Sequence, residues 1–286
     1  MHALLTRLSL AMLNFDALPL LVLMALALLA AAALLGQPAR LERRRERQRR
    51  QVFPPAWRRI LRQRVPAVAK LPAKVQRQLK RHIQVFVAEK TFIGCAGVEI
   101  TDEHRVTIAA QACLLLLGHP KPDYFPRLRE VLVYPGAFAV DSVRPESGGV
   151  VHEQRQALSG QSWAQGRVLL SWAETLAGAA HPDDGRNVVV HEFAHQIDQD
   201  KGRADGQPWR PTEAQRQRWA AVMGEAFQHL QQQPSTLISD YGATDPAEFF
   251  AVISEVFFEQ PQALAAEAPA VYRELALLYQ VNPLVW

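Results

Sequence analysis

The sequence has little cysteine: the 286 residues include only Cys95 and Cys113. Two cysteines cannot build the disulfide framework of a small secreted protein, and they cannot supply a four-cysteine zinc site. Charged residues make up 21% of the chain and apolar residues 49%. These fractions are typical of globular proteins, and they argue against whole-chain disorder and against a polytopic membrane protein.

Acidic residues are scarce in one part of the chain only. Residues 37–90 hold 17 Lys and Arg against 3 Glu, a net charge of +14, whereas residues 91–286 carry a net charge of −10. The overall charge of +4 therefore describes one short basic stretch and not the whole protein. Because few aromatic residues are interleaved with the basic ones and no nucleic-acid motif is present, we predict no nucleic-acid partner.

Residues 17–35 (ALPLLVLMALALLAAAALL) contain no charge. At 1.5 Å per residue, such a helix roughly matches a hydrocarbon core of about 30 Å. The arginine-rich run 40–50 follows at once, which predicts a cytoplasmic location for the rest of the chain. We therefore expect a transmembrane anchor over 1–36, a basic juxtamembrane stem over 37–53, and a single-pass protein of the inner (cytoplasmic) membrane. The alternatives are a cytosolic protein or a cleaved signal peptide.

Residues 54–286 predict a single domain in which a small sheet separates two groups of helices. Such an order of elements indicates the α+β class. We expect the last two strands to form a hairpin, because Gly160 and Gly166 lie between them. The predicted helices are 56–64, 73–89, 106–117, 187–199, 213–232, 246–259 and 269–280, and the predicted strands are 130–134, 150–156 and 167–172.

One motif indicates metal chemistry: residues 191–195 read H-E-F-A-H, the pattern H-E-x-x-H. On a helix, His191 and His195 are one turn apart on the same face, so both rings can bind one zinc ion. Glu192 lies about 100° round the helix, beside the metal, where it can take a proton from bound water. The alternative is a buried helix with two structural histidines, which is disfavoured because burying these polar groups without a partner is costly.

A zinc ion needs a third protein ligand, and three carboxylates are candidates. Glu248 and Glu255 are seven residues apart on an apolar predicted helix, so both can face the same way. Asp198 lies three residues after His195 and is better suited to orienting an imidazole or the following loop. The spacing alone does not choose between Glu248 and Glu255.

Several segments beyond this motif resemble the Mlc titration factor A (MtfA) family of zinc peptidases, a family related to the catalytic domain of anthrax lethal factor. The resemblance covers roughly residues 54–286. It rests on HEFAHQID from position 191, YGATDPAEFFAV from 241, IAAQACLLLL at 108–117, VYP at 133–135, SGQSW at 159–163 and SEVFF at 254–258.

The resemblance implies a zincin-like α+β metallopeptidase domain that binds one Zn²⁺. It implies that His191, His195 and Glu248 are the zinc ligands and that Glu192 is the catalytic base. It also implies that Tyr241 lies near the metal and stabilises the oxyanion, whereas its sequence surroundings alone would suggest packing in a turn.

The predicted function is the hydrolysis of peptide bonds in peptide or protein substrates by zinc-activated water, with an aminopeptidase-like activity implied by the family. A strand such as 167–172 could pair with an extended substrate. The alternative is a regulatory protein that sequesters a transcriptional repressor of the Mlc type without hydrolysis. The intact H-E-x-x-H favours catalysis, because a binding protein needs no general base such as Glu192.

Overall fold

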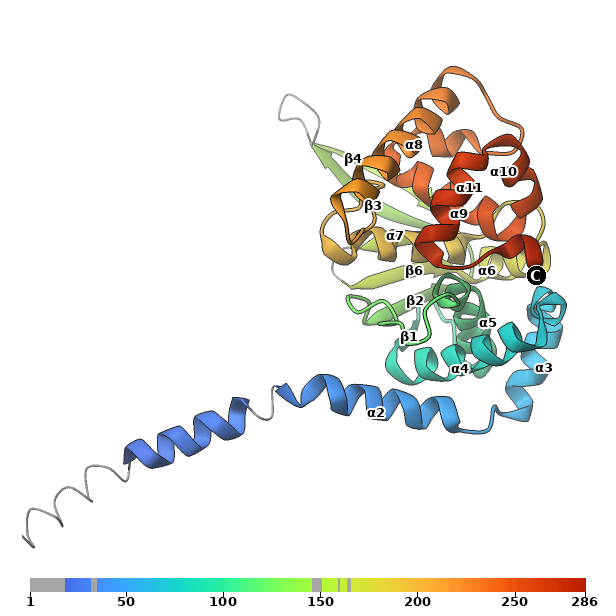
Figure 1. The fold of residues 1–286 in the computed structure, drawn as a ribbon. Coiled ribbons are helices and arrows are strands. Elements are labelled where there is room, and N and C mark those ends of the chain that lie inside the picture. The colour runs from blue at the N-terminus through green and yellow to red at the C-terminus, as the bar shows by residue number, and fades with distance from the viewer. Residues whose placement is uncertain (1–18, 32–34, 146–150, 159, 164–165) are drawn as a thin grey trace, which may run out of the picture. The chain divides into compact units, whose positions relative to one another are not determined.

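A computed structural model of the chain describes residues 19–31, 35–145, 151–158, 160–163 and 166–286 (Figure 1). The chain divides into two compact units, Met1–Gln51 and Val52–Trp286. In the first unit, residues 19–31 are helical, and helix α2 covers Gln37–Arg50. Ion pairs within α2, such as Arg50 to Glu46 at 2.7 Å, partly offset the repulsion among its arginines.

The predicted transmembrane helix is wrong. The described helical run over 19–31 is about 20 Å long at 1.5 Å per residue, which is shorter than a hydrocarbon core of about 30 Å. Among the described residues, no helix has both the length and the apolar content needed to cross a membrane. The apolar composition of 17–35 does not determine how far a helix extends, and residues 17, 18 and 32–34 lie outside the described part. The predicted single-pass membrane location depends on that helix and is wrong with it.

The second unit is mostly helical. Three of its helices, α4, α8 and α9, begin and end where the sequence predicts, and α3, α7 and α11 differ from the prediction by a residue at one or both ends. Proline or an N-capping side chain marks each of these starts. The helices are α3 (Pro55–Arg64), α4 (Ala73–Glu89), α5 (Asp102–Ala112), α6 (Trp172–Ala180), α7 (Val188–Asp198), α8 (Glu213–Gln232), α9 (Pro246–Glu259), α10 (Pro261–Glu267) and α11 (Pro269–Tyr279).

A small sheet has the strand order β1-β2-β6-β5. Strands β1 (Thr91–Gly94), β2 (Glu130–Tyr134) and β6 (Arg167–Ser171) are parallel, and the short β5 (Gly160–Trp163) is antiparallel to β6. Parallel neighbours need a crossover, and α5 lies in the connection between β1 and β2. Among the described elements, only this connection contains a helix, because the described chain between β2 and β6 forms only strands. The predicted α+β class, with its transmembrane helix, is wrong: the described chain is mostly helical, with three parallel strands in a small sheet.

The predicted hairpin is also wrong in its pairing. Strand β4 (Val151–Leu158) pairs antiparallel with β3 (Phe138–Pro145), in the register Phe138 to Leu158. Strand β6 pairs instead with β5, in the register Trp163 to Arg167. The sequence did not reveal β5 as a separate strand, so the predicted hairpin joined β6 to the wrong partner. Residue 150, the first of the predicted strand 150–156, lies outside the described residues.

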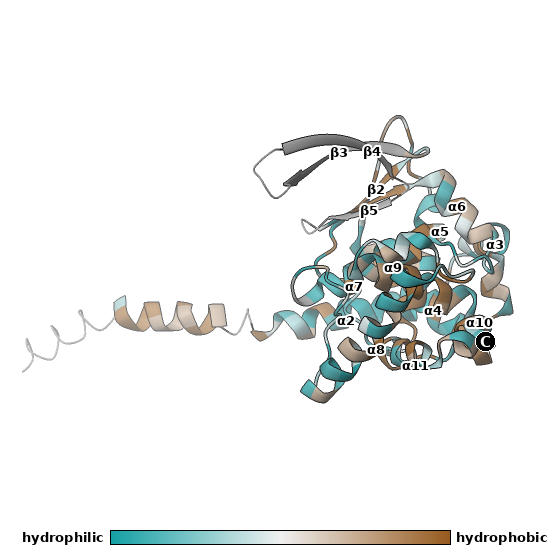
Figure 2. Ribbon diagram, turned by 90° about the horizontal axis from the view of Figure 1, so that it is seen from above, coloured by the Kyte–Doolittle hydropathy of each residue, from teal (hydrophilic) through white to brown (hydrophobic). Residues whose placement is uncertain are grey.

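Helix α7 occupies the centre of the second unit (Figure 1). It contacts β5 and β6 of the sheet as well as α5 and α9. Phe193 of α7 is fully buried, and its ring packs 4.7 Å from that of Phe125 and 5.6 Å from that of Phe86. Figure 2 shows that helices of this unit carry both hydrophobic and hydrophilic residues. The apolar side of α7 is therefore packed in the core. This packing determines the orientation of the polar side chains on its other side.

Candidate metal centre

The first part of the site is the N-terminal half of α7. Its N-cap is Asn187, whose side-chain oxygen accepts a hydrogen bond from the Val190 N–H at 3.0 Å. One turn separates His191 from His195, and the centroids of their rings are 4.9 Å apart. Both imidazoles are buried. The H-E-x-x-H segment thus lies on a helix, as predicted, with both histidines on the same face.

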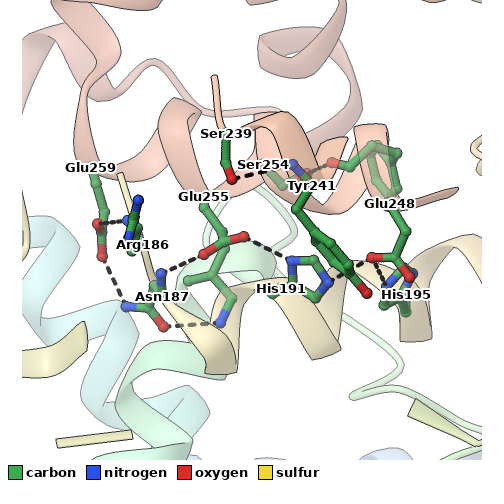
Figure 3. Close-up of polar contacts among 12 residues, drawn as sticks. Arg186, Asn187, His191, His195, Ser239, Tyr241, Glu248, Ser254, Glu255 and Glu259 are labelled. Carbon is green, nitrogen blue, oxygen red and sulfur yellow. Dashed lines mark hydrogen bonds and ion pairs between the residues drawn. The ribbon is translucent and has the colours of Figure 1, made fainter. Parts of the chain in front are cut away.

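The second part is the first turn of α9. The Asp245 side chain caps this helix by accepting hydrogen bonds from the N–H groups of Ala247 and Glu248. Glu248 Oε2 then lies 3.0 Å from His191 Nε2 and 3.4 Å from His195 Nε2 (Figure 3). One ligand atom from each of these three side chains lies within 4.8 Å of the other two. Two imidazoles and a carboxylate from two helices therefore meet at one point.

This group of side chains fits a divalent metal ion. Two histidine nitrogens and a glutamate oxygen are the three-ligand set of several catalytic zinc sites. Glu192 is only 4% exposed, and among the described residues its Oε2 has no hydrogen-bond partner. Burial raises the pKa of Glu192 to about 7, and the nearby Glu248 and Glu255 carboxylates act in the same direction. Several buried carboxylates close together are costly unless a cation offsets their charge.

Protons compete with a metal ion for this site. Burial alone would raise the pKa of Glu248, but its hydrogen bonds to His191 and His195 hold that pKa well below its usual range. Burial likewise would lower the pKa of His191, but hydrogen bonds to Glu248 and Glu255 raise it well above its usual value. Because a metal binds the neutral imidazole, lower pH is expected to release the metal.

Glu255 lies on the other side of His191. Its Oε1 is 2.7 Å from His191 Nδ1, and its Oε2 accepts a hydrogen bond from the Asn187 backbone N–H. Glu248, in contrast, reaches the Nε2 atoms of both histidines. A hydrogen bond from Nδ1–H to Glu255 leaves the Nε2 lone pair directed toward Glu248 and any bound metal. The two glutamates, which spacing alone could not distinguish, thus contact opposite edges of one imidazole.

Sequence reasoning assigned no role to Glu259 and Asn187, two residues that support this arrangement. Glu259, one turn after Glu255, accepts hydrogen bonds from the Asn187 side chain and from the Arg186 N–H, each at 3.0 Å (Figure 3). Burial raises the pKa of Glu259 to about 8. The sequence contained a signal for Glu259, because Glu248, Glu255 and Glu259 are spaced seven and four residues apart on an apolar helix. That spacing places all three carboxylates on one face, which is the face toward α7.

Asp198 orients the following loop. Its Oδ2 accepts a hydrogen bond from the Gly206 N–H at 2.7 Å, and among the described residues His195 Nδ1 has no hydrogen-bond partner. Gly206 has a φ of +75°, and a Cβ there would lie 2.3 Å from the Pro246 carbonyl oxygen. Of the two predicted roles of Asp198, the structure supports the contact with the loop, which packs against the start of α9.

Tyr241 lies in a short 3-10 helix, Asp240–Ala243, just before α9. Its ring centroid is 5.9 Å from that of His191, and the residue is 47% exposed. Burial of part of the side chain raises the pKa of its phenol, and the Glu248 carboxylate raises it further. The hydroxyl therefore stays protonated at neutral pH and can donate a hydrogen bond beside the candidate metal centre (Figure 3).

Replacing Glu255 with glutamine is expected to weaken metal binding about 10- to 100-fold, because the charged partner that orients His191 is lost. The measurement is a competition titration of the purified protein against a chromogenic zinc chelator. The matched control is Glu267→Gln on α10, which removes a charge from a residue that is not part of the site. Equal metal affinity in Glu255→Gln and the wild type would rule out this orienting role.

Comparisons with known proteins agree with this geometry. The model of the glucose-regulated metallo-peptidase M90 family matches residues 39–280. A Synechocystis protein described as uncharacterized protein slr2042 is 37% identical, over 94% of this chain and 99% of its own length. Mlc titration factor A of Klebsiella pneumoniae (strain 342) is 37% identical and that of Escherichia fergusonii 34%, each over 77% of this chain and 84% of its own length. The resemblance predicted from the motifs is thus confirmed, and the chain belongs to the M90 family of metallopeptidases, which includes the Mlc titration factor A proteins.

Proposed function

We propose that this protein is a zinc-dependent peptidase of the H-E-x-x-H type. The main support for this proposal is that the ligand atoms of His191, His195 and Glu248 lie close together, next to the buried Glu192. These three side chains would hold one Zn²⁺. When bound, zinc lowers the pKa of a coordinated water toward about 7 and polarises a carbonyl group.

Glu192 serves as the general base and then as the general acid. Its pKa of about 7, raised by burial, makes its carboxylate basic enough to take a proton from water at neutral pH. The resulting carboxylic acid delivers that proton to the amine that leaves. Tyr241 donates a hydrogen bond from its neutral phenol to the oxyanion that develops on the substrate carbonyl.

The substrate pairs with β5 instead of β6. Strand β6, the candidate from the sequence, has β2 on one side and β5 on the other, so neither of its edges is available. Strand β5 ends the strand order on this side of the sheet, among the described strands, and it contacts α7. An extended peptide added along β5 would therefore run beside the helix that carries Glu192.

Removal of the metal should abolish hydrolysis. We expect a chelator to reduce turnover of a fluorogenic peptide to background and stoichiometric Zn²⁺ to restore it, because the three ligands have no other way to activate water. Hydrolysis that persists in the metal-free protein would contradict the proposal.

The same assay, with substrates that carry a free or an acetylated N-terminus, tests the aminopeptidase specificity that the family implies.

A second candidate function rests on the relatives. Several of them are named Mlc titration factor A, and the corresponding role here is to sequester a transcriptional repressor of the Mlc type. Such binding does not need Glu192. A pull-down of the purified repressor with wild type and with Glu192→Gln separates the two functions, because only hydrolysis depends on the base.

A further inference from the structure

A cavity lies in the second unit, apart from the metal centre. Its volume is about 420 Å³, within the range of about 300–1,000 Å³ that is usual for small-molecule sites. Its walls are residues between 119 and 126, the segment 209–211 and the end of α11, and α7 contributes Gln196 and Ile197. No residue of the candidate metal centre lines it. It is therefore a separate space that shares helix α7 with that centre.

The backbone around this cavity is strained. Tyr124, Phe125 and Gln280 line it with φ values of 50°, 54° and 53°, and they are three of the four non-glycine residues with positive φ in the described part of the chain. L-residues rarely adopt this conformation, because Cβ crowds a carbonyl oxygen. Conformations of this kind persist where the surroundings impose them, and they cluster at ligand-binding and catalytic sites.

The walls are also held close together. Gly118 precedes the loop that forms one wall, and a Cβ at this position would lie 2.0 Å from the carbonyl oxygen of Tyr279, at the end of α11. Only glycine permits this approach. The loop and α11 are thus fixed against each other, and the cavity between them is formed before any ligand arrives.

One buried cation lines the cavity. Arg210 is 7% exposed, its guanidinium lies 4.4 Å from the centroid of the Trp219 ring, and its Nη2 donates to the Glu274 carbonyl oxygen at 2.9 Å. Among the described residues, its Nε has no hydrogen-bond partner. The Glu274 carboxylate is 3.9 Å from Arg210 and forms its short hydrogen bond with Arg218. The Glu274 carboxylate is thus shared by two guanidinium groups, and the Nε of Arg210 stays available to a ligand in the cavity.

The remaining lining fits the apolar part of a ligand. Leu115, Leu277 and Trp209 line the cavity, and the indole of Trp209 is large and rigid. An N–H of a buried guanidinium that lacks a hydrogen-bond partner is energetically costly. Carboxylates and phosphates match the geometry of the guanidinium group better than other acceptors in small metabolites and peptides. Lys121 also lines the cavity, together with the carboxylates of Asp123 and Asp200, so the wall carries both positive and negative charges.

We propose that this cavity binds a small molecule that has a carboxylate and an apolar body, with the carboxylate accepting hydrogen bonds from Arg210. Two sources share this chemistry: the free C-terminus of a short peptide and a simple organic acid. Residues that line the cavity also lie on, or contact, the two helices of the metal centre. Gln196 follows His195 on α7, and the buried Tyr279 hydroxyl donates to Ser254 of α9 at 2.7 Å.

The test is isothermal titration calorimetry of the full chain with three probes: phenylacetate, the dipeptide Ala-Phe, and phenylacetamide as the uncharged match of phenylacetate. Each titration is run with and without a chelator, because a carboxylate can also bind a metal. We expect phenylacetate or Ala-Phe to bind in both conditions. We expect phenylacetamide to bind at least about tenfold more weakly, because it lacks the charge-assisted hydrogen bond.

Two variants locate the binding. Arg210→Gln should weaken binding about tenfold or more, whereas Arg218→Gln, which removes the other partner of Glu274 but does not line the cavity, should change it by less than about threefold. Leu277→Trp fills the cavity from a half-exposed position and should abolish binding without disturbing Arg210. Circular dichroism checks that each variant is folded.

Other outcomes overturn the proposal. They are binding of none of the probes, equal binding of phenylacetamide, binding that disappears with the chelator, or unchanged affinity in Leu277→Trp. Loss of peptidase activity in the metal-site variants would leave this test unaffected, because the proposal does not depend on the proposed function.

Discussion

Replacing Glu192 with glutamine should lower kcat for peptide hydrolysis by about 10²- to 10⁴-fold, the usual contribution of a general base, while zinc remains bound. Glutamine has nearly the same shape as glutamate but cannot accept a proton from water. Glu192 is not among the three side chains that converge on one point, so the variant keeps every candidate ligand. The measurements are kcat and KM for a peptide substrate, together with the zinc content of the same preparation.

The matched control for this experiment is Glu225→Gln on α8, which makes the same chemical change outside the site. It should leave both kcat and zinc content at wild-type values. If Glu192→Gln kept full activity with zinc bound, Glu192 would not be the base. If it lost zinc along with activity, the residue would belong to the metal-binding set, and the proposed division of roles would be wrong.

Replacing Glu248 with alanine should weaken zinc binding by more than about 100-fold, the upper limit for losing a partner that only supports a ligand. The reason is geometric: Glu248 Oε2 is within 3.4 Å of the Nε2 atoms of both His191 and His195, so its removal deletes one of three donors. Glu255→Ala should retain zinc with lowered affinity, because Glu255 contacts the Nδ1 edge of His191.

The measurement is zinc content by mass spectrometry after dialysis against a weak chelator, with thermal unfolding of each variant to verify the fold. The comparison of Glu248→Ala with Glu255→Ala is the informative one, because both remove a carboxylate from the same face of α9. Zinc lost from Glu255→Ala but kept by Glu248→Ala would reverse the assignment of ligand and orienting residue.

Local signals in the sequence predicted much of the helical structure. The predicted helices 213–232 and 246–259 coincide with α8 and α9, because Thr212 and Asp245 cap them and Pro246 starts the second. The pair His191 and His195 could be predicted for the same reason: both lie on one helix, where a spacing of four determines their direction.

Long-range contacts could not be predicted in this way. The expected hairpin paired β6 with the wrong segment, and the parallel arrangement of β1, β2 and β6 was not foreseen, because parallel strands are far apart in the sequence. The apolar composition of residues 17–35 likewise indicated a membrane-spanning helix, although no described helix has the required length and apolar content. Composition shows that a segment is apolar enough for a membrane, whereas the length of its helix depends on the backbone conformation.

The sequence by itself determined the chemistry that is available: two histidines and a glutamate on one helix, a row of carboxylates on another, and the membership of the family that these motifs indicated. Only the tertiary structure decided which carboxylate meets which nitrogen. Glu248 and Glu255 lie on the same face of α9, and the position of α9 along α7 brings one to Nε2 and the other to Nδ1 of His191. The physical reason is that periodicity determines the direction of a side chain within its helix, whereas the packing of two helices determines what it contacts.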